Sequence, residues 1–84
     1  MFYLGIDIGK NTHVASLMDE KAKVIFKAHS FSNSSDGAST LLEKITPYAA
    51  ELEIGMEATG HYWLSLYSFL IASAVNPMLI SKLT

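Results

Sequence analysis

The sequence predicts an α/β domain with helices packed on a mixed sheet and the element order β-β-β-α-β-α-(β). Residues 2–8 alternate between apolar side chains and others, which is typical of a strand with one buried face. Apolar residues recur at three- and four-residue spacing in 38–49 and in 63–74, which predicts two helices. Strand–helix–strand units pair their strands in parallel through right-handed crossovers. We therefore expect residues 1–84 to form one domain.

Side-chain alternation and turn residues predict the first three strands. One face of the first strand is apolar and comprises Phe2, Leu4, Ile6 and Ile8. The opposite face carries Tyr3, Gly5 and Asp7. Residues 12–18 and 23–29 are expected to form an antiparallel pair, which the polar stretch 19–22 joins. Three β-branched and aromatic residues support the second strand of this pair, namely Val24, Ile25 and Phe26.

The stretch 31–37 carries the signals that begin a helix. Asn33 or Ser34 can cap the free amides of the first turn, and Asp36 suits the positive end of the helix dipole. The apolar stripe of this helix consists of Ala38, Leu41, Leu42, Ile45 and Ala49. Pro47 is expected to end or kink the helix.

The second half of the chain predicts a strand, a helix and a final strand. Residues 53–57 have an apolar centre flanked by carboxylates, as in a short buried strand. Thr59 is the expected cap of the second helix. The apolar stripe of this helix consists of Trp63, Leu66, Tyr67, Leu70, Ile71 and Ala74. The last strand is expected over 75–80, although Asn76-Pro77 is unfavourable within a strand.

The composition excludes some classes of protein. Of the 84 residues, 50% are hydrophobic and 17% are charged, which excludes intrinsic disorder. So much apolar surface in a small body predicts a homo-oligomer or a part of a larger domain. The net charge of −2 lacks the basic footprint of a protein that binds nucleic acid by electrostatics alone. Without cysteine, the chain has no disulfide and no thiolate metal site.

Residues 62–81 form an uncharged run that is nominally long enough to cross a bilayer. Asn76-Pro77 interrupts this run, serines dilute it, and no cluster of basic residues flanks it, so we expect no membrane span. No basic segment precedes an apolar one at the N-terminus, so no signal peptide is visible. We therefore expect a cytoplasmic protein.

Two acidic residues occupy strand ends. Asp7 lies near the C-terminal end of the first strand, and Glu57 closes the fourth. If a standard crossover makes these strands neighbours, about 4.8 Å apart, the two side chains converge where α/β sheets bind ligands. Carboxylates about 4 Å apart repel by roughly 4 kcal/mol at an effective dielectric near 20. A shared proton, Lys10 or a divalent cation such as Mg²⁺ or Mn²⁺ would offset this repulsion, and paired cations can activate water against a phosphodiester.

The same residues also have structural explanations. A strand-end Asp is often a turn residue that accepts backbone amides, so only the joint placement of Asp7 and Glu57 favours a functional site. His13 and His29 are expected on the surface or at an edge of the hairpin. His61 lies near the same sheet edge as Glu57, where it packs in the first helical turn or exchanges a hydrogen bond or proton. Three aromatic residues are expected in the core, namely Tyr62, Trp63 and Tyr67.

Several ordered motifs resemble one known family. Gly5-Ile6-Asp7-Ile8-Gly9-Lys10, followed by His13-Val14-Ala15, resembles the opening of the DEDD transposases, the insertion-sequence enzymes related to the Piv invertase. Met56-Glu57-Ala58-Thr59-Gly60-His61-Tyr62 resembles the second acidic motif of that family. Asn76-Pro77 resembles the Asn-Pro that follows its next strand. The resemblance continues through Asn33-Ser34, Gly37 and Leu41-Leu42, and so spans nearly the whole chain.

The resemblance implies a partial RNase H-like fold of the RuvC-like type. In that family four acidic residues bind divalent metal for DNA strand cleavage and exchange; Asp7 matches the first and Glu57 the second. The other two are expected beyond the Asn-Pro motif, and a C-terminal domain with a serine nucleophile beyond them. The chain is therefore expected to be an N-terminal fragment, inactive alone. Relatives use a bridge RNA, so the implied partners of the full-length protein are DNA and a guide RNA, and the implied cofactor is Mg²⁺ or Mn²⁺.

One departure from the family and two alternatives remain. The stretch before Asn76-Pro77 is shorter than usual and lacks an expected glycine, which leaves the register of the last strand open. A strand-Asp-x-Gly hairpin also opens the sugar-kinase and actin-like ATPase fold, although Lys10 stands where those proteins usually have Thr or Ser. A non-catalytic, truncated oligomerisation module is the other alternative.

Overall fold

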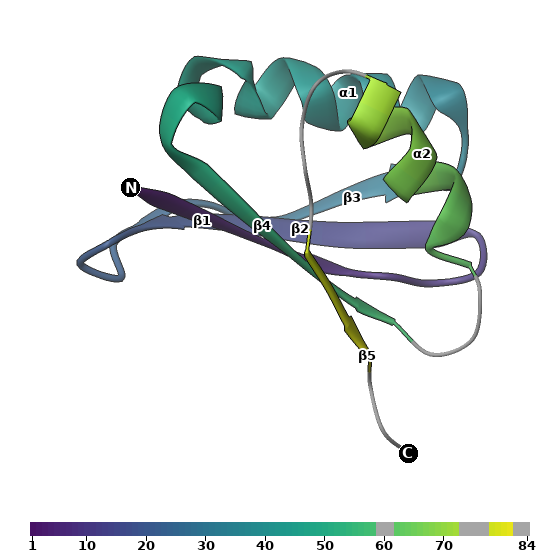
Figure 1. Ribbon diagram of the computed structural model, residues 1–84, viewed down its shortest axis with the longest axis horizontal. Coiled ribbons are helices and arrows are strands. Elements are labelled where there is room, and N and C mark those ends of the chain that lie inside the picture. Colours follow the sequence, from purple (N-terminus) through teal and green to yellow (C-terminus); the bar gives the residue numbers. More distant parts are fainter. Residues whose placement is uncertain (59–61, 73–77, 82–84) are drawn as a thin grey trace.

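The computed structural model describes residues 1–58, 62–72 and 78–81. Its elements are β1 (Phe2–Asp7), β2 (Thr12–Asp19), β3 (Val24–Ser32), α1 (Ser35–Ile45), the 3₁₀ helix η1 (Thr46–Glu51), β4 (Leu52–Ala58), α2 (Leu64–Ala72) and β5 (Met78–Ser81). The predicted element order is confirmed, with η1 as an unpredicted addition (Figure 1). Both strands of the hairpin extend further than predicted, to Asp19 and Ser32.

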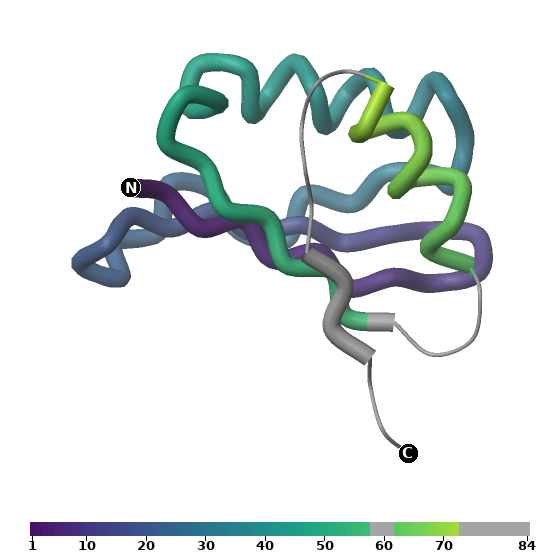
Figure 2. The backbone as a smooth tube through the Cα atoms, viewed as in Figure 1, coloured from purple at the N-terminus to yellow at the C-terminus, as the bar shows by residue number. Residues whose placement is uncertain are grey.

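The strands form one mixed sheet in the order β3-β2-β1-β4-β5. The first three strands pair antiparallel, whereas β1 pairs with β4 and β4 with β5 in parallel. Figure 2 shows β1 and β4 running side by side in the same direction. Parallel neighbours need a crossover, and α1 with η1 supplies the one between β1 and β4 through the chain order β3-α1-η1-β4.

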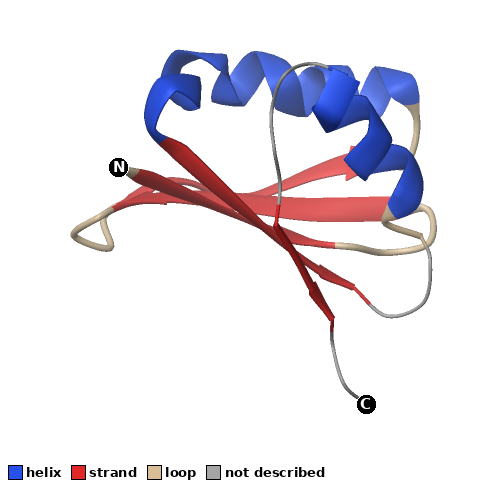
Figure 3. Cartoon of the chain, in the orientation of Figure 1, coloured by secondary structure: helices blue, strands red, loops and turns tan. Residues whose placement is uncertain are grey.

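The α-helices α1 and α2 cover the same face of the sheet (Figure 3). The buried core lies between these helices and the sheet, and it consists of Leu4, Ile6, Ala15, Leu17, Phe31, Ala38, Leu41, Ile45, Ile54, Met56, Leu66 and Leu70. Alternation along β1 places Leu4 and Ile6 in this core and leaves Tyr3 and Asp7 exposed on the opposite face, as predicted. We call this second face, which no described helix covers, the open face.

Local signals explain where α1 begins and ends. Ser34 is the N-cap, and its hydroxyl accepts the N–H of Gly37 at 3.0 Å. The helix ends at Ile45, and Pro47 stands in the first turn of η1, where its missing N–H costs nothing. Ala49 lies in η1 and is exposed, so its predicted place in the apolar stripe is wrong. The change from α-helical to 3₁₀ winding takes it out of the helical phase.

The sequence pattern of the last helix is confirmed in part. Leu66 and Leu70 are buried, but Ile71 is 41% exposed, so its predicted core position is wrong. A helix of nine residues with mostly apolar side chains presents only one face to the core, and Ile71 falls outside it. Thr59, Ala74 and Asn76-Pro77 lie outside the described residues. Within the described residues, no helix is long and apolar enough to span a membrane.

Candidate metal centre

The two acidic residues singled out in the sequence lie opposite each other on neighbouring strands. Asp7 and Glu57 are register partners in the parallel pair β1–β4, the last pair of that ladder. Both side chains are exposed. Their common parity with Tyr3 and Glu53, which are also exposed, puts both carboxylates on the open face. The expected juxtaposition is present, at the C-terminal ends of two adjacent parallel strands.

Backbone contacts hold the chain in place just after Asp7. The N–H of Ile8 donates to the carbonyl of Glu57 at 3.1 Å and so extends the β1–β4 ladder past the carboxylates. At Gly9 an added Cβ would lie 2.3 Å from the carbonyl oxygen of Thr12, so only glycine fits this turn. Asn33 closes the turn from outside, because its side-chain amide donates to the carbonyl of Lys10 at 3.1 Å. These contacts leave Asp7 little freedom to move away from β4.

A shallow depression of about 490 Å³ lies on the open face beside the carboxylates. It is lined by Gly5, Ile6, Asp7, Val14, Ser16, Gly55 and Glu57. Gly5 and Gly55 are register partners, so bare backbone forms the floor next to the acidic pair. An extended, negatively charged ligand can approach such a floor closely once a cation neutralises the carboxylates.

The donor set fits a hard divalent cation. Two carboxylates supply oxygen ligands, and Mg²⁺ is commonly held by one or two carboxylates together with waters and substrate phosphates. In residues 1–58, 62–72 and 78–81 no group of three or more His, Cys, Asp or Glu side chains gathers as a metal site. This part of the chain therefore offers two ligands and leaves the rest of a coordination sphere to other donors.

The other charged candidate does not neutralise Asp7. Lys10 is exposed, and among the described residues it forms no ion pair with Asp7. His61, the third group expected at this edge, lies outside the described residues. The other two ways considered for offsetting the repulsion are a shared proton and a divalent cation.

The predicted position is right for His29 and wrong for His13. His29 is half-buried on the edge strand β3, and burial, with a contribution from Lys44, lowers the pKa of its imidazole. His13 is only 1% exposed, so its expected place at the surface is wrong. The signal was in the sequence, because His13 shares the parity of Ala15 and Leu17 on β2, both fully buried.

The aromatic residues near α2 belong mainly to the core. Trp63 and Tyr67 pack against it and meet edge to face, with ring centroids 5.4 Å apart, which confirms their prediction. Tyr62 is 39% exposed, so its predicted core position is wrong. It precedes the first turn of α2 and has no helical phase to bury it.

Comparisons with known proteins agree with this geometry. The chain is similar in structure to T. thermophilus RuvC, solved in complex with a Holliday junction substrate, with a TM-score of 0.70 and 12% identity over 98% of this chain. It spans 65% of that RuvC chain. It also resembles Archaeoglobus fulgidus Pelota, with a TM-score of 0.55 and 12% identity over 99% of this chain and 27% of that one. At such identities these likenesses show the fold alone, which is RuvC-like α/β.

Sequence comparison carries the assignment further. No curated protein matches the chain significantly. A family model described as a transposase of the DEDD type, IS110, matches residues 4–84. The match includes both acidic residues and decides against the kinase-like alternative. The chain belongs to the IS110 family of DEDD transposases.

Proposed function

We propose that this chain is the N-terminal part of a metal-dependent DNA transposase domain in which Asp7 and Glu57 hold Mg²⁺ or Mn²⁺. The observation that carries the proposal is the pairing of Asp7 with Glu57 at the C-terminal ends of adjacent parallel strands. Family membership supports DNA strand cleavage and exchange as the reaction. The structural likeness to RuvC, which was solved with a DNA junction, supports DNA as the partner.

In this proposal, the two carboxylates are the metal ligands that this part of the chain contributes. Their strands are neighbours, about one strand spacing apart, and both carboxylates are on the open face, so one cation could accept oxygens from both. A bound divalent cation would polarise a phosphoryl oxygen and lower the pKa of a water molecule. Gly5 and Gly55 keep the neighbouring floor free of side chains, so a nucleic-acid strand can lie against it. The hydrogen bond from the N–H of Ile8 to the carbonyl of Glu57 holds the two strands together beside the pair.

Metal binding is tested by thermal unfolding with and without Mn²⁺. We expect Mn²⁺ to raise the melting temperature of the wild type, because a ligand that binds only the folded state stabilises it. Asp7→Asn and Glu57→Gln should each abolish most of this rise. Glu53→Gln is the matched control, since Glu53 lies on the same strand and face but pairs with Tyr3. An equal response of all four proteins to Mn²⁺ would refute the site.

A nuclease assay tests the expectation that the chain is inactive alone. The chain supplies two of the four acidic residues that the family resemblance implies, so we expect no cleavage of DNA with Mg²⁺ or Mn²⁺. Cleavage that disappears in Asp7→Asn would contradict this expectation while supporting the metal site.

For the full-length protein, the family resemblance also supports a guide RNA as a partner.

The open face also favours association of the chain with another protein surface. Tyr3, Val14 and Met18 are 41%, 38% and 40% exposed there, on adjacent strands. Apolar side chains gathered on one face are commonly covered by another protein surface. We propose a second copy of the chain as the partner in solution. Sedimentation equilibrium should give a dimer that Met18→Lys weakens; a monomer at all concentrations would refute association.

A further inference from the structure

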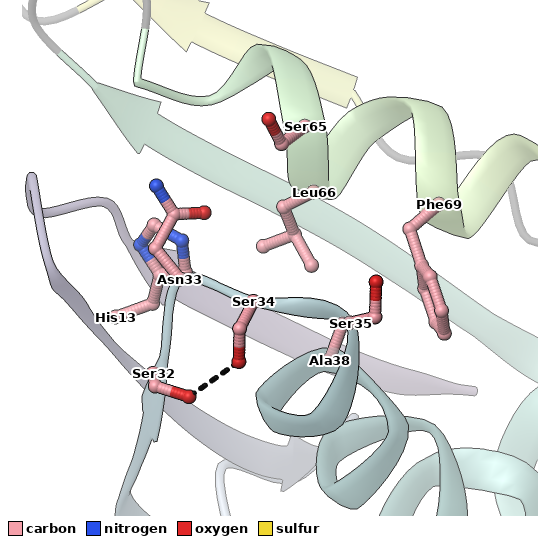
Figure 4. A pocket seen from close by; sticks show the side chains of 9 residues that line it. All are labelled: His13, Ser32, Asn33, Ser34, Ser35, Ala38, Ser65, Leu66 and Phe69. Atoms are coloured by element: carbon pink, nitrogen blue, oxygen red, sulfur yellow. Dashed lines mark hydrogen bonds between the residues drawn. The ribbon is translucent and has the colours of Figure 1, made fainter.

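A second cavity lies on the other side of the sheet from the acidic pair. It has a volume of about 210 Å³ and opens between the first turns of α1 and α2. His13 and Asn33 line one side of it, and Ser65, Leu66 and Phe69 of α2 line the other (Figure 4). A single water in the liquid occupies roughly 30 Å³, so the cavity can take a larger guest.

The buried histidine presents an unused donor to this cavity. His13 is 1% exposed, and its Nδ1 accepts the N–H of Gly9 at 3.2 Å. In the neutral ring the hydrogen must therefore be on Nε2. Nε2 is buried, and no atom of the described residues accepts its hydrogen bond. A buried donor without an acceptor is costly, which points to an acceptor on a guest molecule.

Two helix N-termini face the same space. The first amides of α1 and α2 have no intrahelical acceptors, and both dipoles are positive at these ends. On α2 the N–H of Tyr67 donates to the carbonyl of Trp63 at 2.9 Å, so among the described residues the helical hydrogen bonds begin at Tyr67. Ser35 and Ser65 bring further hydroxyl groups to the lining at the two helix starts, whereas the Ser34 hydroxyl already bonds to Ser32 and accepts the N–H of Gly37.

The charges around the cavity favour an anion. No carboxylate lines it, so nothing negative opposes an anionic guest from within. Asp36, in the first turn of α1, is exposed and lies outside the lining, where water screens its charge. The His13 donor and the two positive helix ends together match the oxygens of a phosphate group.

We propose that this cavity binds a phosphate group through His13 Nε2–H and the first-turn amides of α1 and α2. The group is either free phosphate or a phosphodiester of a nucleic-acid strand. The cavity and the acidic pair lie on opposite faces of the sheet, so this site does not depend on the metal centre.

Heteronuclear NMR titration of the chain in EDTA tests the proposal. Inorganic phosphate is added in one series and a short DNA duplex in another. We expect saturable shifts of the His13 ring and of the Ser35 and Ser65 amides. If phosphate alone causes them, the guest is a free phosphate; if the duplex reproduces them, it is a backbone phosphate. The absence of shifts in both series would overturn the proposal.

Two variants separate binding from folding. Ser35→Pro removes one amide donor at the first helical position, where proline is favoured, and Ser34 before it is already extended at φ −153° and ψ 166°. His13→Phe removes the ring donor. Each should weaken binding about tenfold, as expected for the loss of one hydrogen bond to a charged group. Ser39→Ala on α1 and His29→Phe on β3 are controls that should bind as the wild type. Wild-type affinity in Ser35→Pro overturns the proposal, even if His13→Phe fails to fold.

Discussion

The two faces of the sheet differ in what their side chains can do. On the covered face Leu4, Ile6 and Leu17 are at most 2% exposed and pack against α1 and α2. On the open face Tyr3 and Met18 are about 40% exposed, and the exposed residues Asp7 and Glu57 lie there as register partners. The same strands supply both faces by alternation. One face therefore carries the stability of the fold, and the other keeps polar and apolar groups available for ligands and partners.

The largest expected difference between the two faces is in the free energy of unfolding, and truncating neighbouring residues that point to opposite faces measures it. Leu17→Ala should cost about 2–5 kcal/mol of unfolding free energy, because it leaves a cavity in the core. Met18→Ala, next to it on the open face, should cost about 1 kcal/mol or less. Urea unfolding measures both. Equal losses would show that the open face is also packed in solution, as it would be in a dimer.

The second prediction compares two glycines. At Gly37 an added Cβ would lie 2.1 Å from the carbonyl oxygen of Ser32, so Gly37→Ala should cost about 1–3 kcal/mol through strain at the start of α1. At Gly5, on the open face, an added Cβ meets nothing within 4 Å. Gly5→Ala should leave the free energy of unfolding nearly unchanged. Thermal unfolding of the two variants checks the difference, and a large loss in Gly5→Ala would contradict it.

The third prediction concerns the acidic pair without metal. Both carboxylates are exposed, so water screens much of their mutual repulsion. Asp7→Asn should therefore stabilise the chain slightly in EDTA, and added salt should reduce the gain because it screens the wild-type repulsion. Unfolding at low and high salt measures this. Destabilisation by Asp7→Asn at low salt would show that another group already neutralises the pair.

The smallest effect lies in the turn between β2 and β3, outside both faces. The N–H groups of Lys23 and Lys21 each donate to the Asp19 carboxylate at 2.9 Å and hold the pKa of this group below its usual value. A lowered pKa stabilises the folded chain above the unfolded pKa of about 3.9, and this stabilisation is lost as the pH falls through the folded pKa. Asp19→Asn should reduce the loss of folding stability at acidic pH. An unchanged pH profile of unfolding would show that other carboxylates dominate it.

Much of the fold could be predicted because local chemistry and global packing agree here. Alternation in β1, the Ser34 cap and the proline after α1 each act over a few residues, and the structure confirms them. The acidic pair was also predictable, because a crossover between parallel strands brings their C-terminal ends together. Three of the errors concern helices, unlike that of His13. Ala49, Ile71 and Tyr62 have suitable side chains for a core, but helix type and helix length turn them towards water.

By itself the sequence determined the α/β class, the order of the elements and the two residues that meet at the sheet edge. Periodicity, caps and strand ends are local properties, and they need no knowledge of distant contacts. Only the tertiary structure decided that α1 and α2 cover the same face, and that His13 is buried beside the first turns of both helices. Burial depends on which segments pack together, and that is a property of the whole chain.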